Sequence, residues 1–520
     1  MPLRWLTYAA GLVVATFVSA PLFYLVMRAM ALGPYRVLEF WWRHGQVQLL
    51  MQTVALMVGV VAIANAIAIP AAWLVARTDL RYRGIWATIL ALPLVIPSYV
   101  SAFSWVSVLG PRGLLQGMVS FLGVERLPAI AYGYTGALFA LALFTYPYLF
   151  LPLVAAMNSL DGSTEESSRV LGIGPWRTFF RVTLPQLRGS IATGSLLIAL
   201  YALSDFGAVS IVRYNTLTLG VYNAYRSLFD RSGAALAGLQ LAVVALAVVG
   251  LHGLVRRRER RSTTGSQRTR SVIELGRWRI LARIGLSCVV VLNIGIPLLA
   301  ISAWLTRSGL PQSTRGLMSA TLNSFTVSSL AAIAAVVLAF PVALWVTRSP
   351  GFVGRWVERL SITGFAMPGL VVALSLVFVA TRQLPWMYQT TLLVVIAYVI
   401  RFLPESLGAT RNALLQFSPH YEEAARNLGH GAISTFRSVT WPLIRPGVLA
   451  GGALVFMTAM KELPATLILR PIGFETLATT IWSAASESYY ADAALPALCL
   501  LFVGAVPVYR FSIQPTLRVP

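Results

Sequence analysis

Hydrophobic residues occur along this chain in long runs that short polar segments separate. Each run has about 20 residues or more, the length that an α-helix needs to cross the hydrocarbon core of a bilayer. Lipid cannot satisfy backbone hydrogen bonds, so such a run must close them internally as a helix. The pattern predicts about twelve spans, at residues 6–31, 48–76, 85–109, 133–157, 189–212, 234–255, 280–304, 321–347, 357–380, 391–412, 446–469 and 493–511.

The two halves of the chain repeat one another. Early in each half, Thr53, Pro70, Arg77 and Pro97 match Ser324, Pro341, Arg348 and Pro368 at one constant offset. Later, Pro147, Glu166, Gly172, Pro185, Arg188, Asp205 and Arg213 match Pro404, Glu423, Gly429, Pro442, Arg445, Glu462 and Arg470 at a second offset. We therefore predict an all-α polytopic membrane protein with like-oriented six-span halves at residues 1–255 and 280–520. A pseudo-two-fold axis along the membrane normal would place the solute pathway where the halves meet.

Composition supports a membrane protein and indicates its orientation. Charged residues make up 11% of the chain and hydrophobic residues 57%, whereas about 25% of a soluble domain is charged. The net charge of +23 comes from arginines that cluster between apolar runs, which is typical of cytoplasmic loops rather than of nucleic-acid binding. This bias predicts that both termini are cytoplasmic. Cys288 and Cys499 each lie inside an apolar run, without a spacing that indicates a disulfide or a metal site.

Residues 256–279 are polar and rich in arginine, beginning with Arg256-Arg-Arg-Glu-Arg-Arg261. Such a composition predicts a cytoplasmic linker between the halves. Binding of anionic lipid or of a regulator is an alternative role for the same charges.

Two polar loops interrupt the apolar pattern at matching positions, residues 161–188 and 418–445; we call them the first and second polar loops. Asp161, or Ser163 with Glu166 as a capping box, predicts the start of a short helix in the first loop, and Ser418-Pro419 does so in the second. Gly172 and Gly429 are predicted to end these helices. A second short helix is expected in each loop, stopped by Pro185 or Pro442 before the chain re-enters the bilayer.

Other side chains of the polar loops suit contact with a soluble partner. The small pairs Ser167-Ser168 and Ala424-Ala425 permit close approach of another backbone. Phe179 and Phe436, at matching positions, are expected to enter a pocket on that partner. The alternative is that the loops are amphipathic connectors lying at the membrane interface.

Each polar loop has the order Glu, two small residues, three residues, Gly, nine residues, an aliphatic residue, one residue and an apolar-Pro pair. This pattern resembles the EAA loop of ATP-binding-cassette importer permeases, in the fused two-permease form. Ser167-Ser168 replaces the usual alanines, and Trp441 replaces the usual leucine. The resemblance implies that these residues contact the coupled ATPase: Glu166, Ser167, Ser168, Gly172, Trp176, Phe179, Pro185, Glu423, Ala424, Ala425, Gly429, Phe436 and Pro442.

The resemblance also implies the partners. An ATP-binding-cassette homodimer would bind the two polar loops from the cytoplasm of a bacterial inner membrane, and a substrate-binding protein would dock outside. ATP and Mg would be held by the partner, because the sequence contains no Gly-x-x-x-x-Gly-Lys-Ser/Thr loop and no catalytic constellation. Ser204-Asp-Phe-Gly207 and Lys461-Glu-Leu-Pro-Ala-Thr466 resemble ferric-iron permeases, so iron is the expected cargo; thiamine and phosphonate permeases are close relatives.

Charged residues in or beside the spans form a second candidate site, the solute pathway. Charge is costly in a bilayer and usually faces a cavity or a partner. The candidates are Asp205, Arg213, Lys461, Glu462 and Arg470. Asp205 and Glu462 occupy equivalent positions, so they would pass a hard trivalent cation transiently, without a permanently bound metal. Alternatively, Asp205, Lys461 and Glu462 form structural ion pairs.

A transporter driven by an ion gradient is the alternative of a different class. Arg77-Thr-Asp-Leu-Arg-Tyr-Arg-Gly84 faintly resembles a signature of such proteins. That alternative does not explain two matching polar loops.

Overall fold

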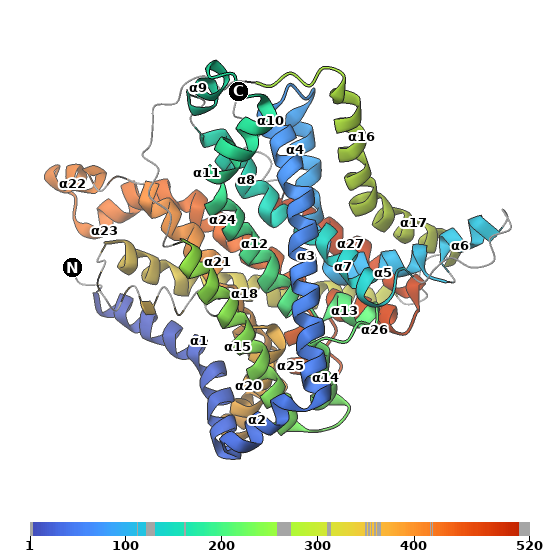
Figure 1. Ribbon diagram of the computed structural model, residues 1–520. Helices are drawn as coiled ribbons and strands as arrows, with labels where there is room; N and C mark the ends of the chain where they lie inside the picture. Colours follow the sequence, from blue (N-terminus) through green and yellow to red (C-terminus); the bar gives the residue numbers. More distant parts are fainter. Residues whose placement is uncertain are drawn as a thin grey trace.

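The computed structural model is built from α-helices (Figure 1). It describes residues 4–508 apart from 112, 121–129, 161–162, 257–271, 309–313, 417, 419 and most of 349–365. The first-half helices are α1 (Arg4–Leu32), α2 (Pro34–Trp42), α3 (His44–Arg77), α4 (Arg83–Ala91), α5 (Ser98–Leu109), α6 (Leu114–Val119), α7 (Gly133–Thr145), α8 (Pro147–Ser159), α9 (Ser163–Val170), α10 (Pro175–Thr178), α11 (Leu184–Gln186), α12 (Arg188–Ser204), α13 (Gly207–Ile211), α14 (Leu217–Arg226) and α15 (Arg231–Arg256).

The second half repeats this order. Its helices are α16 (Trp278–Val290), α17 (Ile296–Ser308), α18 (Thr314–Arg348), α20 (Gly369–Arg382), α21 (Thr391–Gln416), α22 (His420–Asn427), α23 (Ala432–Thr435), α24 (Trp441–Met460), α25 (Pro464–Leu469), α26 (Leu477–Ser486) and α27 (Tyr490–Val508). Five short 3-10 or π segments join them, η1 (Leu92–Val95), η3 (Phe179–Thr183), η4 (Val291–Gly295), η5 (Pro385–Met387) and η6 (Phe436–Thr440).

The all-α polytopic architecture is confirmed, whereas the count of twelve spans is not. Eight helices of the described residues are long and apolar enough to cross a membrane, or ten if two sharply bent helix pairs each count as one span. Two predicted spans, 357–380 and 493–511, are represented by the shorter apolar helices α20 and α27. Pro97 and Pro368 have extended backbones and immediately precede α5 and α20, so each span is broken where proline removes a backbone donor.

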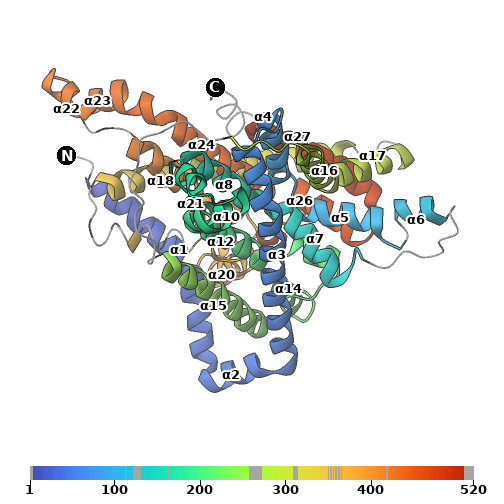
Figure 2. The ribbon, with the colours of Figure 1, turned by 45° about the horizontal axis from the view of Figure 1, so that its top comes forward.

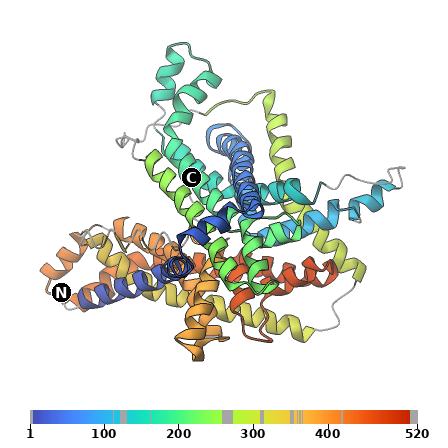
Figure 3. The same ribbon diagram turned by 60° about the horizontal axis from the view of Figure 1, so that its bottom comes forward.

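The two halves are interlocked through their first helices. In the first half α3, α8 and α12 pack together, and the corresponding α18, α21 and α24 pack together in the second. Helix α1 packs against α18 and α20 of the second half, and α17 packs against α5 of the first. Figures 2 and 3 both show α1, in dark blue, beside the yellow and orange helices of the second half. Each half therefore covers part of the other.

The described end of the linker, residues 272–277, attaches to the joint that follows α3. Ile273 and Thr78 form an isolated parallel β-bridge. The Ile273 N–H donates to the carbonyl of Arg77 at 2.9 Å, and the Leu275 N–H donates to the Asp79 carboxylate at 3.0 Å. Asp79 also pairs with Arg279. The remaining linker, residues 257–271, lies outside the described residues, so its predicted roles stay predictions.

Replacing Asp79 by Asn should loosen this attachment. The Leu275 N–H, and then the Arg279 guanidinium, hold the pKa of Asp79 below its usual value. The ionised Asp79 carboxylate therefore stabilises the attached linker fully at pH values above the usual aspartate pKa. This stabilisation is lost as the pH falls through the lowered pKa of Asp79. We expect faster hydrogen exchange of the Leu275 amide in D79N at neutral pH, and in the unmodified chain on acidification. Unchanged exchange in D79N would contradict the contribution of this carboxylate.

Candidate functional site

The two polar loops fold alike. Helices α9 and α22 have the same length, and each is followed by a four-residue helix and a five-residue π turn at equivalent positions. Gly172 and Gly429 have φ of 74° and 86°, the left-handed conformation of a C′ glycine. The Ile173 N–H donates to the Ser168 carbonyl and the His430 N–H to that of Ala425, each at 3.1 Å. The prediction that these glycines end the helices is confirmed.

The predicted helix starts at Asp161 and Pro419 lie outside the described residues. The prediction that a proline stops the second helix is wrong for Pro442, whereas the helical segment Trp176–Gln186 of the first loop ends one residue after Pro185 and meets α12 at a bend of 69°. Pro442 lies in the first turn of α24 and Pro185 in that of α11, where a helix needs no proline N–H. Each π turn leads directly into these helices. In the second loop the chain therefore runs as one helical unit from Ala432 to Met460.

A buried glutamate anchors each polar loop to the end of a long helix. In the first loop, Glu165 accepts a hydrogen bond from the Thr183 hydroxyl at 2.8 Å and pairs with Arg77 at 3.3 Å. The Arg77 and Glu165 side chains are only 2% and 7% exposed. Because α3 ends at Arg77, this contact joins the loop rigidly to a membrane-spanning helix.

The second loop repeats this anchor at equivalent positions. Glu422 accepts from the Thr440 hydroxyl at 2.6 Å and pairs with Arg348, the last residue of α18. The Arg348 side chain is 43% exposed. We call the two arrangements the first and second anchors. Sequence analysis chose the following residues, Glu166 and Glu423, and missed the anchors, although matched Glu-Glu pairs and matched Arg77 and Arg348 were available signals.

The structure distinguishes the members of the small pairs. Ser168 is buried, and its hydroxyl lies 3.0 Å from that of Thr178; Ala425 is buried at the equivalent place. Ser167 and Ala424 are exposed. One small residue therefore lets the loop fold on itself, and the other lies on its outer surface.

The structure describes the side chain of Glu423 but not that of Glu166. Glu423 is 64% exposed and lies 3.1 Å from His420 Nδ1. The backbone of Glu166 lies in α9, and its side chain lies outside the description. The predicted contact of both with a partner stays a prediction.

The expectation that Phe179 enters a partner's pocket is wrong for the state described. Phe179 is 8% exposed and its ring lies 5.9 Å from that of Trp73 on α3. Phe436 is half-buried against Phe340 of α18, with ring centroids also 5.9 Å apart. Trp73 and Phe340, which lie far from the polar loops in the sequence, therefore provide the apolar contacts that the loops themselves lack.

Other apolar side chains of the polar loops are exposed in matched pairs. Leu171 and Trp176 are 77% and 66% exposed in the first loop, and Leu428 and Ile433 are 81% and 71% exposed at the equivalent positions of the second. Figure 1 shows α9 and α10 at the top and α22 and α23 at the left, away from α2 at the bottom and α6 at the right. We call these four side chains the exposed apolar pairs.

A cavity of about 80 Å³ lies where the halves meet. Both halves contribute to its wall, through α5, α8, α12, α21 and α24 and the segments that follow α12 and α24. Its charged side chains are Asp205, Arg401, Glu405, Lys461 and Glu462. We call this the inter-half cavity. Asp205, Lys461 and Glu462 therefore lie together, as predicted for pathway residues.

Asp205 and Glu462 cap equivalent short helices. The Asp205 Oδ1 accepts from the Ala208 N–H at 2.9 Å, and the Glu462 Oε1 accepts from the Ala465 N–H at 3.1 Å. These bonds satisfy donors at the starts of α13 and α25. Each carboxylate therefore has a structural role at the start of a short helix.

The partners of these caps differ between the halves. The Ser98 hydroxyl donates to Asp205 at 2.5 Å, whereas Arg401 pairs with Glu462. Gly369 occupies the position equivalent to Ser98, and a Cβ there would lie 2.6 Å from Glu462 Oε1 and 2.8 Å from Arg401 Nη1. Glycine thus makes room for the ion pair.

Lys461 does not form the alternative ion pair with Glu462. Its Nζ donates to the Leu94 carbonyl at 2.7 Å. Leu94 lies in η1, before the break at Pro97, so Lys461 joins the two halves across the cavity. Sequence analysis missed Arg401 and Glu405, although both are charged residues inside a predicted span.

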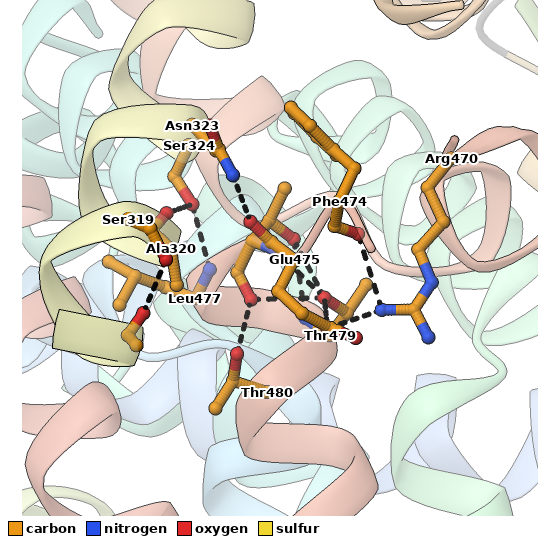
Figure 4. A network of polar contacts seen from close by, with 12 residues as sticks. Ser319, Ala320, Asn323, Ser324, Arg470, Phe474, Glu475, Leu477, Thr479 and Thr480 are labelled. Atoms are coloured by element: carbon orange, nitrogen blue, oxygen red, sulfur yellow. Dashed lines mark hydrogen bonds and ion pairs between the residues drawn. The ribbon is translucent and has the colours of Figure 1, made fainter. Parts of the chain in front are cut away.

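Arg213 and Arg470 do not line the inter-half cavity, and their assignment to the pathway stays a prediction. Arg213 is exposed and stacks over the Tyr132 ring at 5.8 Å. Arg470 pairs with Glu475, whose backbone carbonyl accepts from Asn323 Nδ2 at 2.9 Å (Figure 4). Both arginines lie in loops beyond the short helices, Arg213 against an aromatic ring and Arg470 against a carboxylate.

These features define a class of protein: a polytopic helical membrane protein with two repeated halves, paired polar loops and a charged cavity between the halves. The chain belongs to the family of binding-protein-dependent transport system inner membrane components, whose model matches residues 67–261 and 335–513. It is therefore a multi-pass permease of that family.

Individual relatives agree with the fused arrangement. The chain is 32% identical over 519 residues to the Fe(3+)-transport system permease protein FbpB 2 of Haemophilus influenzae, covering 98% of both chains. It is 23% identical over 402 residues to the ferric transport system permease protein FbpB of Actinobacillus pleuropneumoniae, covering 73% of this chain and 58% of the relative. It is 28% identical over 221 residues to the sulfate transport system permease protein CysW of Escherichia coli, covering 42% of this chain and 75% of the relative.

Proposed function

We propose that this chain is the permease of an ATP-driven importer and that its cargo is ferric iron. The repeated anchor carries the proposal. Both polar loops join a long helix of their own half through a buried glutamate, so force applied to a loop is transmitted to the walls of the inter-half cavity. The chain supplies the pathway and no ATPase site of its own.

An ATPase homodimer is proposed to bind the two polar loops, one subunit on each. The exposed apolar pairs would be buried in that contact, and burial of apolar surface would hold the complex together. Glu166 and Glu423 would meet basic residues of the ATPase. ATP and Mg would bind the ATPase, whose closure would move the loops together.

Movement of the loops would reach the cavity through the anchors. Arg77 and Arg348 end α3 and α18, which pack against α12 and α24 of the cavity wall. A change in the separation of the loops would then tilt these helices, and the contact between Lys461 and Leu94 would open or close. A substrate-binding protein docked on the outer face would deliver cargo. Both termini would lie in the cytoplasm, on the side of the loops.

Iron is the cargo proposed because two relatives that cover most of this chain are ferric permeases by name. Thiamine and phosphonate remain alternatives for the same machinery. No observation specifically favours a transporter driven by an ion gradient, because that mechanism does not explain why both polar loops are anchored to long helices.

Alanine at Glu166 and at Glu423 tests the coupling. Both variants should lose transport-coupled ATP hydrolysis, but to different extents, because the loops around them differ in sequence. The measurement is ATP hydrolysis stimulated by the loaded binding protein in proteoliposomes. Equal losses would count against functional asymmetry of the loops, and full activity in both would contradict the coupling role.

A further inference from the structure

We propose that Glu405 is the carboxylate that contacts cargo in the inter-half cavity, and that this cavity accepts a hard cation rather than an oxyanion. The inference rests on the proposed function and deepens it. Its basis is the set of hydrogen bonds that the cavity's charged groups already make.

Two of the three cavity carboxylates are engaged by the protein. Asp205 accepts from the Ser98 hydroxyl and from the backbone at the start of α13. Glu462 pairs with Arg401 and accepts from the start of α25. Releasing either for cargo would leave a backbone donor or a buried arginine without a partner, which is costly.

Glu405 is engaged least. Within the described residues, its only hydrogen-bond partner is the Thr458 hydroxyl, at 3.0 and 3.2 Å from the two carboxylate oxygens. A carboxylate has about four lone-pair sites, so most of its capacity is free. It lies on α21 inside a membrane span, where an ionisable group usually serves a pathway.

The equivalent position in the first half is Tyr148, which lines the same cavity. Tyr99 adds a further phenol: it is 2% exposed, and within the described residues its hydroxyl has no hydrogen-bond partner. A buried polar group without a partner is costly unless a ligand satisfies it. Carboxylate and phenol oxygens are hard donors, which a trivalent cation prefers.

The charge of the wall favours a cation as well. Three carboxylates and two cationic groups line the cavity, so its wall is net negative. Arg401 is paired with Glu462, and Lys461 donates one of its three N–H groups to the Leu94 carbonyl. A molybdate or sulfate ion would meet this excess of carboxylates, and the arginine of the wall is already paired with Glu462.

The arrangement suits passage rather than storage. No three His, Cys, Asp or Glu side chains are grouped as a metal ligand set in the part of the chain that the structure describes. Glu405 would therefore bind the cation weakly, assisted by phenols, and release it. Conduction requires such binding.

The test uses terbium(III), a hard trivalent cation whose emission is sensitised by nearby tyrosine, with the purified full chain in detergent. We expect the unmodified chain to give tyrosine-sensitised emission on titration with terbium. Glu405→Gln should lower the affinity for terbium obtained from this titration about tenfold, the scale of one charge-assisted contact. Glu39→Gln is the matched control, because Glu39 is exposed and pairs with Arg43 on the surface. Equal affinities for E405Q and the unmodified chain, or displacement of terbium by molybdate at equal concentration, would overturn the proposal.

A second measurement separates this proposal from the proposed function. In the complete transporter, E405Q should lose uptake of radioactive ferric iron but retain the co-purified ATPase. Normal iron uptake by E405Q would overturn the role of Glu405, and loss of the ATPase would assign Glu405 a structural role instead. If the unmodified chain binds terbium through Glu405 but never retains an ATPase, the proposed function fails and the cation site stands.

Discussion

Replacing Arg77 by alanine should abolish ATP-coupled transport and destabilise the chain. The substitution leaves the Glu165 carboxylate buried with the Thr183 hydroxyl but without its arginine. Breaking a buried ion pair in this way costs about 3–5 kcal/mol, so the first polar loop should detach from α3. The measurements are the midpoint of thermal unfolding in detergent and ATP hydrolysis stimulated by loaded binding protein.

The second anchor gives a matched comparison. Arg348 pairs with Glu422, but its side chain is 43% exposed, and water screens such a pair to about 1 kcal/mol or less. Arg348→Ala should therefore have a smaller effect than Arg77→Ala. Arg43→Ala, which removes an exposed pair with Glu39, should change neither measurement. Intact coupling in R77A, or equal losses in R77A and R348A, would contradict the role assigned to burial.

Removing the exposed aromatic and aliphatic side chains of both short loop helices should release the ATPase. In the double variant Trp176→Ala, Ile433→Ala, each loop loses an apolar side chain that is 66% or 71% exposed. Burial of one such side chain is worth about 1.5–3 kcal/mol, so the two together should weaken association by more than about a hundredfold. The measurement is the amount of ATPase that co-purifies with the chain.

A surface control shows whether that loss is specific. Ile472 is 87% exposed in the loop between α25 and α26, which lies outside both polar loops. Ile472→Ala should retain the ATPase, and the double variant should unfold at the same temperature as the unmodified chain. Retention of the ATPase by the double variant would contradict the proposed docking surface.

Repetition made much of the architecture predictable from sequence. The matched prolines and glycines stand where the local backbone geometry requires them. Gly172 and Gly429, for example, have the positive φ that ends a helix. The breaks at Pro97 and Pro368 also follow from local chemistry, and within the described residues each break divides a predicted span into shorter helical pieces. Local patterns therefore predicted the elements better than their lengths.

The features of the site that could not be predicted from the sequence depend on contacts between segments that are far apart in the chain. The sequence pattern pointed to Glu166, and only the place of Arg77 at the end of α3 shows that Glu165 is buried in an ion pair. Phe179 looked available for a partner because Trp73 lies on another helix. Packing between long helices decided these cases.

The cavity shows the same limit. Equivalence within the repeat pointed to Asp205 and Glu462, and both line the cavity. It could not reveal Glu405, because the equivalent residue in the first half is a tyrosine. Comparison of the two repeats therefore cannot identify a functional residue at a position where the halves differ.

Uptake of radioactive ferric iron into proteoliposomes tests the central claim most directly. The vesicles should contain the chain with its co-purified ATPase, and iron-loaded binding protein should be supplied on the outer face. We predict uptake that requires ATP and Mg on the side of the polar loops and that stops when the ATPase is omitted. Uptake by the chain alone, without ATP, would contradict the account.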